Sequence, residues 1–200
     1  MVVLAGNIGV GKTTVTARLS DELGYKPVFN TSAQNPYLDR FYSDPPQSQA
    51  EWAFKSQLYF LKEGIRQHLQ IQDEGGCVQE LSVYEHFLVM AHDHRDQGWI
   101  TPEDFDTLSG LFFAVERLLQ PPDLLVLLEA PTEQLLRRAA GRPGLTADYL
   151  NRLQRRYRSF ADGWLRSPVL TIDTTETDVN TEEGLDRAAE LVINRLGSLR

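Results

Sequence analysis

Residues 6–13 read Gly6-Asn7-Ile8-Gly9-Val10-Gly11-Lys12-Thr13, and this stretch decides the fold. It follows the short apolar run of residues 2–5, and it opens a segment with apolar residues at helical spacing, at positions 15, 19 and 23. A strand, a glycine-rich loop and a helix in this order, with the pattern G-x-x-x-x-G-K-[ST], are typical of a P-loop that binds phosphate groups.

Each residue type in the loop suits phosphate chemistry. The glycines let the backbone curl so that successive N–H groups converge on phosphate oxygens, at the positive N-terminus of the following helix. Lys12 brings a positive charge to the β- and γ-phosphates, and the hydroxyl of Thr13 can bind Mg²⁺. We therefore expect ATP or another nucleoside triphosphate, with Mg²⁺, as cofactors. The loop residues expected to bind them are Gly6, Asn7, Gly9, Gly11, Lys12, Thr13 and Thr14.

The composition limits the class of protein. The 200 residues, of which 42% are hydrophobic and 24% charged, suit a single domain over residues 1–200 with a sizeable core. The net charge of −8 argues against a nucleic acid as the main partner, because a phosphate backbone binds basic surfaces. No segment reaches the roughly 20 apolar residues of a membrane span. The single Cys77 suits a reducing compartment, so we expect a cytoplasmic protein that binds no membrane.

Predicted strands and helices alternate along the rest of the chain. Apolar runs predict strands over residues 2–5, 26–29, 77–79, 123–129 and 169–172. Apolar spacing, caps and breakers predict a helix after the loop, a turn running into a short helix over 35–42, and helices over 48–72, 82–97, 102–119, 132–140, 146–161 and 181–197. This alternation predicts an α/β domain with a five-stranded parallel sheet flanked by helices.

The motifs on these elements resemble those of the deoxyribonucleoside kinase family, in particular bacterial deoxyadenosine and deoxyguanosine kinases. The resemblance covers nearly the whole chain and depends on the order and spacing of its segments. Besides residues 6–13, these segments are Asn35-Pro36-Tyr37-Leu38 with Phe41-Tyr42, Phe54 with Gln57 and Tyr59-Phe60-Leu61, Glu80-Leu81-Ser82-Val83-Tyr84, Pro122-Asp123-Leu124-Leu125-Val126-Leu127-Leu128, and Tyr149-Leu150 with Leu153.

The resemblance implies a P-loop kinase fold with a short arginine-bearing lid at about residues 138–146. It also implies that the γ-phosphate of ATP is transferred to the 5′-hydroxyl of a deoxynucleoside, with a purine favoured. By this resemblance the catalytic residues are Glu80, Lys12, Arg138 and Arg142, and Mg²⁺ is held by Thr13 and Glu80.

On the acceptor side the resemblance is partly broken. Gln57 resembles the amide that binds the base edge, and Tyr42 resembles the phenol that binds the sugar 3′-hydroxyl. The family places a glutamate as general base where this chain has Asn30, and an amide cannot take a proton near neutral pH. The arginine that accompanies this glutamate is replaced by Leu81. A second charged pair of the family, which also belongs to the acceptor site, is replaced by Gly64 and His86.

Three functions therefore stay open. The leading hypothesis is an ATP-dependent deoxynucleoside kinase that binds a small-molecule nucleoside at an altered acceptor site. An ATP-binding regulatory subunit with little or no activity, paired with an active paralogue, would also explain the lost charges. A nucleoside monophosphate kinase should need more arginines around the acceptor phosphate, and positions 64 and 81 speak against it.

Other clusters in the sequence have simpler interpretations. Seven arginines between residues 137 and 158 suit a phosphate-binding lid and a solvated helix better than an RNA-binding face, given the acidic chain. His92 and His94 flank Asp93, but side chains at i and i+2 of a helix point apart, which disfavours a metal site. The apolar stripe over residues 108–119 is either core or, by the resemblance, part of a homodimer or heterodimer interface.

Overall fold

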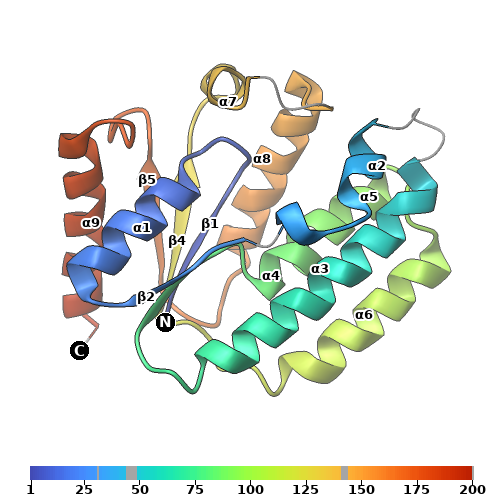
Figure 1. Ribbon diagram of the computed structural model, residues 1–200, viewed down its shortest axis with the longest axis horizontal. Helices are drawn as coiled ribbons and strands as arrows, with labels where there is room; N and C mark the ends of the chain where they lie inside the picture. The colour runs from blue at the N-terminus through green and yellow to red at the C-terminus, as the bar shows by residue number, and fades with distance from the viewer. Residues whose placement is uncertain (31, 44–48, 141–143, 200) are drawn as a thin grey trace.

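Five parallel strands form one sheet in the order β2-β3-β1-β4-β5, as the computed structural model of the chain shows (Figure 1). The structure describes all residues except 31, 44–48, 141–143 and 200. This architecture confirms the predicted α/β fold with a five-stranded parallel sheet. The strands are β1 (Val2–Gly6), β2 (Lys26–Val28), β3 (Cys77–Glu80), β4 (Leu124–Glu129) and β5 (Val169–Asp173).

The central position of β1 decides where a ligand can bind. Every residue of β1 is buried, as expected for a parallel strand that is covered by helices on both faces. It pairs with β3 on one side and β4 on the other, in the registers Val2↔Val78 and Val2↔Leu124. The chain builds β2 and β3 on one side of β1 before it crosses to β4 and β5. Ligands of open parallel sheets bind outside the carboxyl ends of the strands at such a switch point.

Helices follow the strands in the predicted alternation, and Figure 1 shows them on both faces of the sheet. In chain order they are α1 (Lys12–Leu23), the 3₁₀ turn η1 (Ser32–Gln34), α2 (Leu38–Ser43), α3 (Gln49–Ile71), α4 (Val83–Glu85), the π-helical η3 (His86–Ala91), α5 (His92–Asp96), α6 (Pro102–Glu116), α7 (Thr132–Arg138), α8 (Ala147–Asp162) and α9 (Glu182–Gly197).

The alternation of side chains along β1 divides the core into two layers. Val2 and Leu4 pack against α1 and α9 on one face of the sheet. Val3 and Ala5 belong to the larger core on the other face, with side chains from α3, α4, η3, α6 and α8. The carboxyl ends of the strands therefore lie between these two layers, at the top of Figure 1. Among the described helices none is long and apolar enough to cross a membrane.

The helix predicted over residues 82–97 is observed as α4, η3 and α5, because its middle section is π-helical. A π-helical turn holds an additional residue, and it often occurs at functional sites. Two other predicted helices, over 102–119 and 132–140, end earlier than expected, at Glu116 and Arg138. The first ends before Pro121 and Pro122, which cannot continue a helix.

Gly64 lets α3 approach α4 closely. A Cβ atom at this position would lie 3.1 Å from the Cα of Val83 and 3.3 Å from Cδ2 of His86. At Gly110, which is exposed in the middle of α6, an added Cβ would meet no heavy atom within 4 Å. The two glycines therefore give a matched pair for testing the helix packing.

We predict opposite effects for alanine at the two sites. Gly64→Ala should lower the free energy of unfolding by about 1 kcal/mol or more, because a packed backbone must move. Gly110→Ala should raise it by about 0.5–1 kcal/mol, since alanine is the better helix former. Urea denaturation of both variants measures the difference. Equal stabilisation by both substitutions would contradict the close approach of α3 to α4.

Candidate active site

The loop between β1 and α1 has the conformation that its glycines require. Gly11 has a φ of 102°, and a side chain at Gly6 would lie 2.5 Å from the carbonyl oxygen of Leu128. The first turn of α1 carries no acidic residue, and its N-cap is Gly11, which has no side chain to occupy the N–H groups. These N–H groups and the positive end of the helix dipole are arranged to bind an anion.

Two polar side chains stabilise the loop. The Nζ atom of Lys12 donates hydrogen bonds to the carbonyl oxygens of Gly6, at 2.7 Å, and Asn7, at 3.0 Å. The side chain of Asn7 is buried and donates to the carbonyl oxygen of Leu150 on α8, at 2.8 Å. Asn7 thus fastens the loop to α8, while Thr14 lies exposed on α1. Of the loop residues predicted to bind the triphosphate, Asn7 therefore contributes to the structure of the loop. Thr14 lies at the margin of the phosphate site.

The Glu80 carboxylate connects the loop to the end of β2. Its Oε2 accepts a hydrogen bond from the Thr13 hydroxyl at 2.7 Å, and its Oε1 accepts one from the backbone N–H of Asn30 at 2.8 Å. Glu80 is only 5% exposed. A hydroxyl and a carboxylate at this distance suit Mg²⁺, which takes few protein ligands and completes its shell with phosphate oxygens and water. Thr13 and Glu80 are therefore the described residues that could hold a Mg²⁺ ion at this position.

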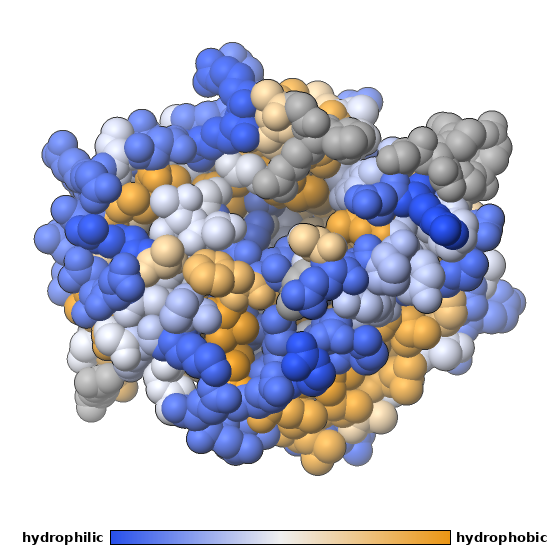
Figure 2. Space-filling model, viewed as in Figure 1, coloured by the Kyte–Doolittle hydropathy of each residue, from blue (hydrophilic) through white to orange (hydrophobic). Residues whose placement is uncertain are grey.

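A cavity of about 260 Å³ opens beside the phosphate loop, and Figure 2 shows this face of the molecule hollowed near its middle. The structure brings the four residues predicted to bind the substrate, Asn30, Tyr42, Gln57 and His86, to the wall of this one cavity. The rest of the described lining is formed by Ile8, Ser32, Leu38, Asp39, Phe41, Phe60, Leu81, Met90, His94, Leu145 and Tyr149.

Three buried polar atoms of residues that line this cavity have no hydrogen-bond partner among the described residues. They are Oε1 of Gln57 and the Nδ1 atoms of His86 and His94. All three side chains are at most 5% exposed. Burial lowers the pKa of both histidines to about 3, so their rings are neutral near pH 7. Buried polar atoms without a partner cost free energy, so these three side chains are the described polar groups of the lining whose hydrogen bonding is incomplete.

Asn30 and Leu81, where the family resemblance implies a charged pair, have local structural roles. Oδ1 of Asn30 accepts a hydrogen bond from the backbone N–H of Ser32 at 2.9 Å. Leu81 follows Glu80 with a φ of 57°, a conformation that is rare for a branched side chain. Both residues line the cavity, which therefore has an amide and an apolar side chain where the family resemblance implies an ion pair.

The arginines of the lid region are only partly described. Arg138, the last residue of α7, donates hydrogen bonds to Oγ1 and the carbonyl oxygen of Thr174, at 2.9 and 3.0 Å, and pairs with Asp178 at 3.7 Å. Its guanidinium is therefore held against the loop that follows β5. The helix predicted over residues 132–140 ends at Arg138, and Arg142 lies outside the described residues.

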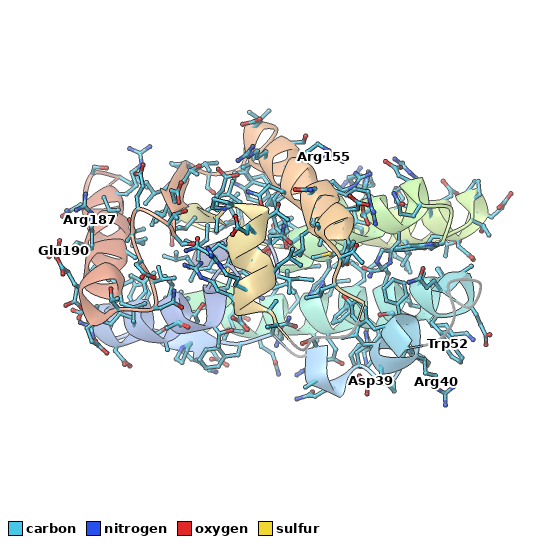
Figure 3. All side chains as sticks on the ribbon, turned by 90° about the horizontal axis from the view of Figure 1, so that it is seen from above. Asp39, Arg40, Trp52, Arg155, Arg187 and Glu190 are labelled. Atoms are coloured by element: carbon cyan, nitrogen blue, oxygen red, sulfur yellow. The ribbon has the colours of Figure 1, made fainter. Side chains whose placement is uncertain are left out.

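Most of the arginines of α8 are paired with acidic side chains. Arg152 and Arg156 both pair with the buried Asp93 of α5, and Arg158 pairs with Glu129. Figure 3 shows Arg155 on the side of α8 away from α2. These contacts agree with the interpretation of the arginine-rich helix as a structural and solvated element.

Glu85 is a buried acid that the sequence interpretation missed. Its Oε2 accepts hydrogen bonds from the backbone N–H and the hydroxyl of Ser82, at 2.8 and 3.2 Å, and so caps α4. Burial raises the pKa of the Glu85 carboxyl to about 7, against the opposing effects of the Lys12 charge and the Ser82 hydrogen bonds. The pattern Ser82-x-x-Glu85 is a capping box, and this signal could have identified the residue.

The fold, the phosphate loop and the paired Thr13 and Glu80 define a P-loop phosphotransferase. The sequence model of the deoxynucleoside kinase family matches residues 2–196, and the chain belongs to this family. Kinases of this family use a nucleoside triphosphate as the phosphate donor.

Curated relatives and solved structures agree with this assignment. The deoxyadenosine/deoxycytidine kinase of Bacillus subtilis (strain 168) is 31% identical over 209 residues, which cover 100% of this chain and 92% of that protein. A deoxyguanosine kinase of Lactobacillus johnsonii is 32% identical over 198 residues, covering 92% and 86%. The structure of deoxyadenosine kinase from M. mycoides with bound dCMP and dCDP has a TM-score of 0.80 at 22% identity, covering 98% of each chain. The structural likeness is one of fold.

We predict that Glu85 makes the stability of the protein depend on pH. Because its pKa is raised from 4.5 to about 7 on folding, its contribution is fully present below pH 4.5 and is lost as the pH rises through 7. As the pH rises between these limits, the unfolding free energy of wild type should fall by about 3 kcal/mol through the ionisation of Glu85. Glu85→Gln keeps the cap but cannot ionise, so it should not show this loss.

Urea denaturation at pH 5 and pH 8 measures this difference. Glu133→Gln, at an exposed position on α7, is the matched control and should follow wild type. Identical pH slopes for wild type and Glu85→Gln would show that the Glu85 carboxyl is not held in its neutral form.

Proposed function

We propose that this protein is an ATP- and Mg²⁺-dependent deoxynucleoside kinase that transfers the γ-phosphate to the 5′-hydroxyl of a deoxynucleoside. The observation that carries the proposal is the junction of two sites at Glu80. One is a phosphate loop with Lys12 and Thr13 in place, and the other is a cavity whose unpartnered polar atoms belong to Gln57 and two neutral histidines. A purine is favoured weakly, because deoxyadenosine and deoxyguanosine kinases are prominent among the relatives.

The charge of the cavity favours a nucleoside over a nucleoside monophosphate as acceptor. Its described lining contains no arginine or lysine, and the one acidic residue, Asp39, would repel a phosphate. A phosphate dianion without a cationic partner is costly to remove from water. A neutral nucleoside has hydroxyl and base-edge groups that match the amide and imidazole atoms of the wall.

The residues of the chain have separate tasks in the proposed transfer. Lys12 and the N-terminus of α1 bind the β- and γ-phosphates, and Thr13 and Glu80 hold Mg²⁺, which neutralises charge that develops during transfer. Asn30 cannot remove the proton of the 5′-hydroxyl, so transfer depends on positioning and on the Glu80 carboxylate. Phosphoryl transfer tolerates this loss because its transition state is loose, although a general base contributes about 10²–10⁴-fold.

Association into dimers is a further part of the proposal. Within the predicted apolar stripe of residues 108–119, Leu108 and Phe112 are buried in the core. Leu111 and Leu118 are 45% and 67% exposed, and Leu58 of α3 and Phe113 of α6 are exposed as well. This exposed surface suits a homodimer, or a heterodimer with a paralogue.

A regulatory subunit is the second candidate function, and the replacements Asn30 and Leu81 favour it. The two candidates are separated by steady-state phosphorylation with ATP and Mg²⁺, tested against all four deoxynucleosides and their monophosphates. Phosphorylation of a deoxynucleoside, abolished in Lys12→Ala, supports the kinase. Tight ATP binding with no phosphorylation of any acceptor supports the regulatory subunit, and phosphorylation of monophosphates alone would contradict both.

We predict that the family's ion pair restores catalysis only when both charges are added. In Asn30→Glu the new carboxylate would lie close to Glu80, whose Oε1 contacts the backbone of residue 30, and this repulsion raises its pKa and weakens it as a base. Adding Leu81→Arg supplies an opposite charge in the same cavity wall. The double variant should phosphorylate a deoxynucleoside at least ~10-fold faster than wild type, and Asn30→Glu alone should gain little.

Initial rates for wild type, both single variants and the double variant measure this effect. Leu81→Arg alone is the control for the added charge. A double variant no faster than an already active wild type would show that positioning and Glu80 suffice.

A further inference from the structure

The side chain of Asn7 joins the phosphate loop to α8. Its Oδ1 accepts a hydrogen bond from the backbone N–H of Ile8 at 2.8 Å, and its Nδ2 donates to the carbonyl oxygen of Leu150 at 2.8 Å. A longer contact of 3.4 Å runs from Nδ2 to Oε1 of Gln154. Asn7 is only 2% exposed, and an N–H on one side with carbonyl oxygens on the other fixes the orientation of its amide. The amide is therefore a buried cross-link between two segments that lie far apart in the sequence.

Both segments that Asn7 joins form part of the wall of the cavity proposed to bind the acceptor. Ile8, whose N–H the Asn7 side chain binds, lines this cavity. Tyr149, which precedes Leu150 on α8, lines it as well. Figure 1 shows the loop that follows β1 beside α8. The position of this wall relative to the phosphate loop therefore depends on the Asn7 amide.

The main chain of the same residue belongs to the donor part of the site. Nζ of Lys12 donates a hydrogen bond to the carbonyl oxygen of Asn7 at 3.0 Å. A substitution of the Asn7 side chain leaves this carbonyl in place, so it changes the link to α8 more than the contact of the lysine. Asn7 is thus the residue at which the phosphate loop and the acceptor wall meet.

The helix α8 has other supports that do not involve the loop. Arg152 and Arg156 pair with the buried Asp93, and Arg158 pairs with Glu129. Within the described part of the chain, the hydrogen bonds between loop residues 6–11 and α8 both come from the Asn7 side chain. Loss of this side chain should therefore leave α8 folded and change its position relative to the loop.

We propose that Asn7 is a positioning residue for phosphoryl transfer, whose side-chain amide holds the wall of Ile8 and Tyr149 at a fixed position relative to the phosphate loop. The inference rests on the proposed kinase function and extends it. In the transfer, the 5′-oxygen of the acceptor forms a bond to the γ-phosphorus, the bond to the β,γ-bridging oxygen breaks, ADP leaves and one proton is released to water.

The rate of this transfer depends on how well the acceptor is aligned. The attacking and leaving oxygens must lie roughly in line, and a misplacement of about 1 Å can cost about 10²-fold in rate. Asn7 acts on the rate by fixing where the acceptor hydroxyl lies relative to a γ-phosphate bound at the loop.

The experiment measures how the γ-phosphate is divided between two acceptors, a deoxynucleoside and water. Wild type and Asn7→Ala receive ATP, Mg²⁺ and a saturating amount of the deoxynucleoside that wild type phosphorylates fastest, and the nucleoside monophosphate and free phosphate are both quantified. Water needs no contact with the acceptor wall, so hydrolysis is less sensitive to the position of that wall. Asn7→Ala should lower the ratio of monophosphate to free phosphate at least ~10-fold, while the Kd for ADP, from isothermal titration calorimetry, changes ~3-fold or less.

Two further variants show whether the effect belongs to the bond between Asn7 and Leu150. Gln154→Ala is the matched control, because it removes the longer contact to α8 and leaves the bond to Leu150. It should keep the wild-type ratio within ~2-fold, since a long hydrogen bond is a weak one. Asn7→Ser has a side chain too short to reach Leu150, and it should lower the ratio as Asn7→Ala does.

The outcomes separate this inference from the proposed function. A ratio in Asn7→Ala equal to that of wild type overturns the role of Asn7 and leaves the kinase proposal standing. A fall in ADP affinity as large as the fall in the ratio would show that Asn7 only builds the loop, and it also overturns the inference. Wild type that binds ATP but phosphorylates none of the four deoxynucleosides overturns the proposed function, and the role of Asn7 with it. If Asn7→Ala does not fold, an unchanged ratio in Asn7→Ser overturns the inference.

Discussion

The carboxylate of Glu80 is the contact on which the arrangement of the site depends. One of its oxygens accepts from the Thr13 hydroxyl of the phosphate loop, and the other accepts from the backbone of Asn30 at the end of β2. These hydrogen bonds join the carboxyl ends of β1, β2 and β3 at the switch point of the sheet. The donor and acceptor parts of the site therefore share one carboxylate, and a change in its position would affect both.

The two parts of the site differ in how they are built. The donor part consists of backbone N–H groups, a lysine and a helix dipole, which suit a highly charged ligand. The cavity proposed for the acceptor is lined by amides, neutral imidazole rings and apolar side chains, with Asp39 as the one acidic residue of its described lining. Gly64 lets α3 approach Val83 and His86 closely, so the position of His86 in this lining depends on helix packing. The proposed acceptor part would recognise a neutral molecule by hydrogen bonds and shape.

The phosphate loop, the five strands and Glu80 at the end of β3 lie where the sequence predicted them, whereas the roles of the site residues stay predictions. The residues of the phosphate loop, the five strands and the position of Glu80 follow from local patterns, since each depends on neighbours in the chain. The buried Glu85 and the docking of Arg138 on Thr174 depend on contacts between distant elements. Helical spacing also could not reveal that residues 86–91 are π-helical.

The most direct test of this account is the effect of Mg²⁺ on ATP affinity in wild type and Glu80→Gln. If Glu80 and Thr13 hold the metal, wild type should bind ATP more tightly with Mg²⁺ than with EDTA. Glu80→Gln should lose most of this difference while keeping its affinity for metal-free ATP, because Lys12 and the N-terminus of α1 are unchanged. An undiminished Mg²⁺ effect in a folded Glu80→Gln protein would contradict the central place given to this carboxylate.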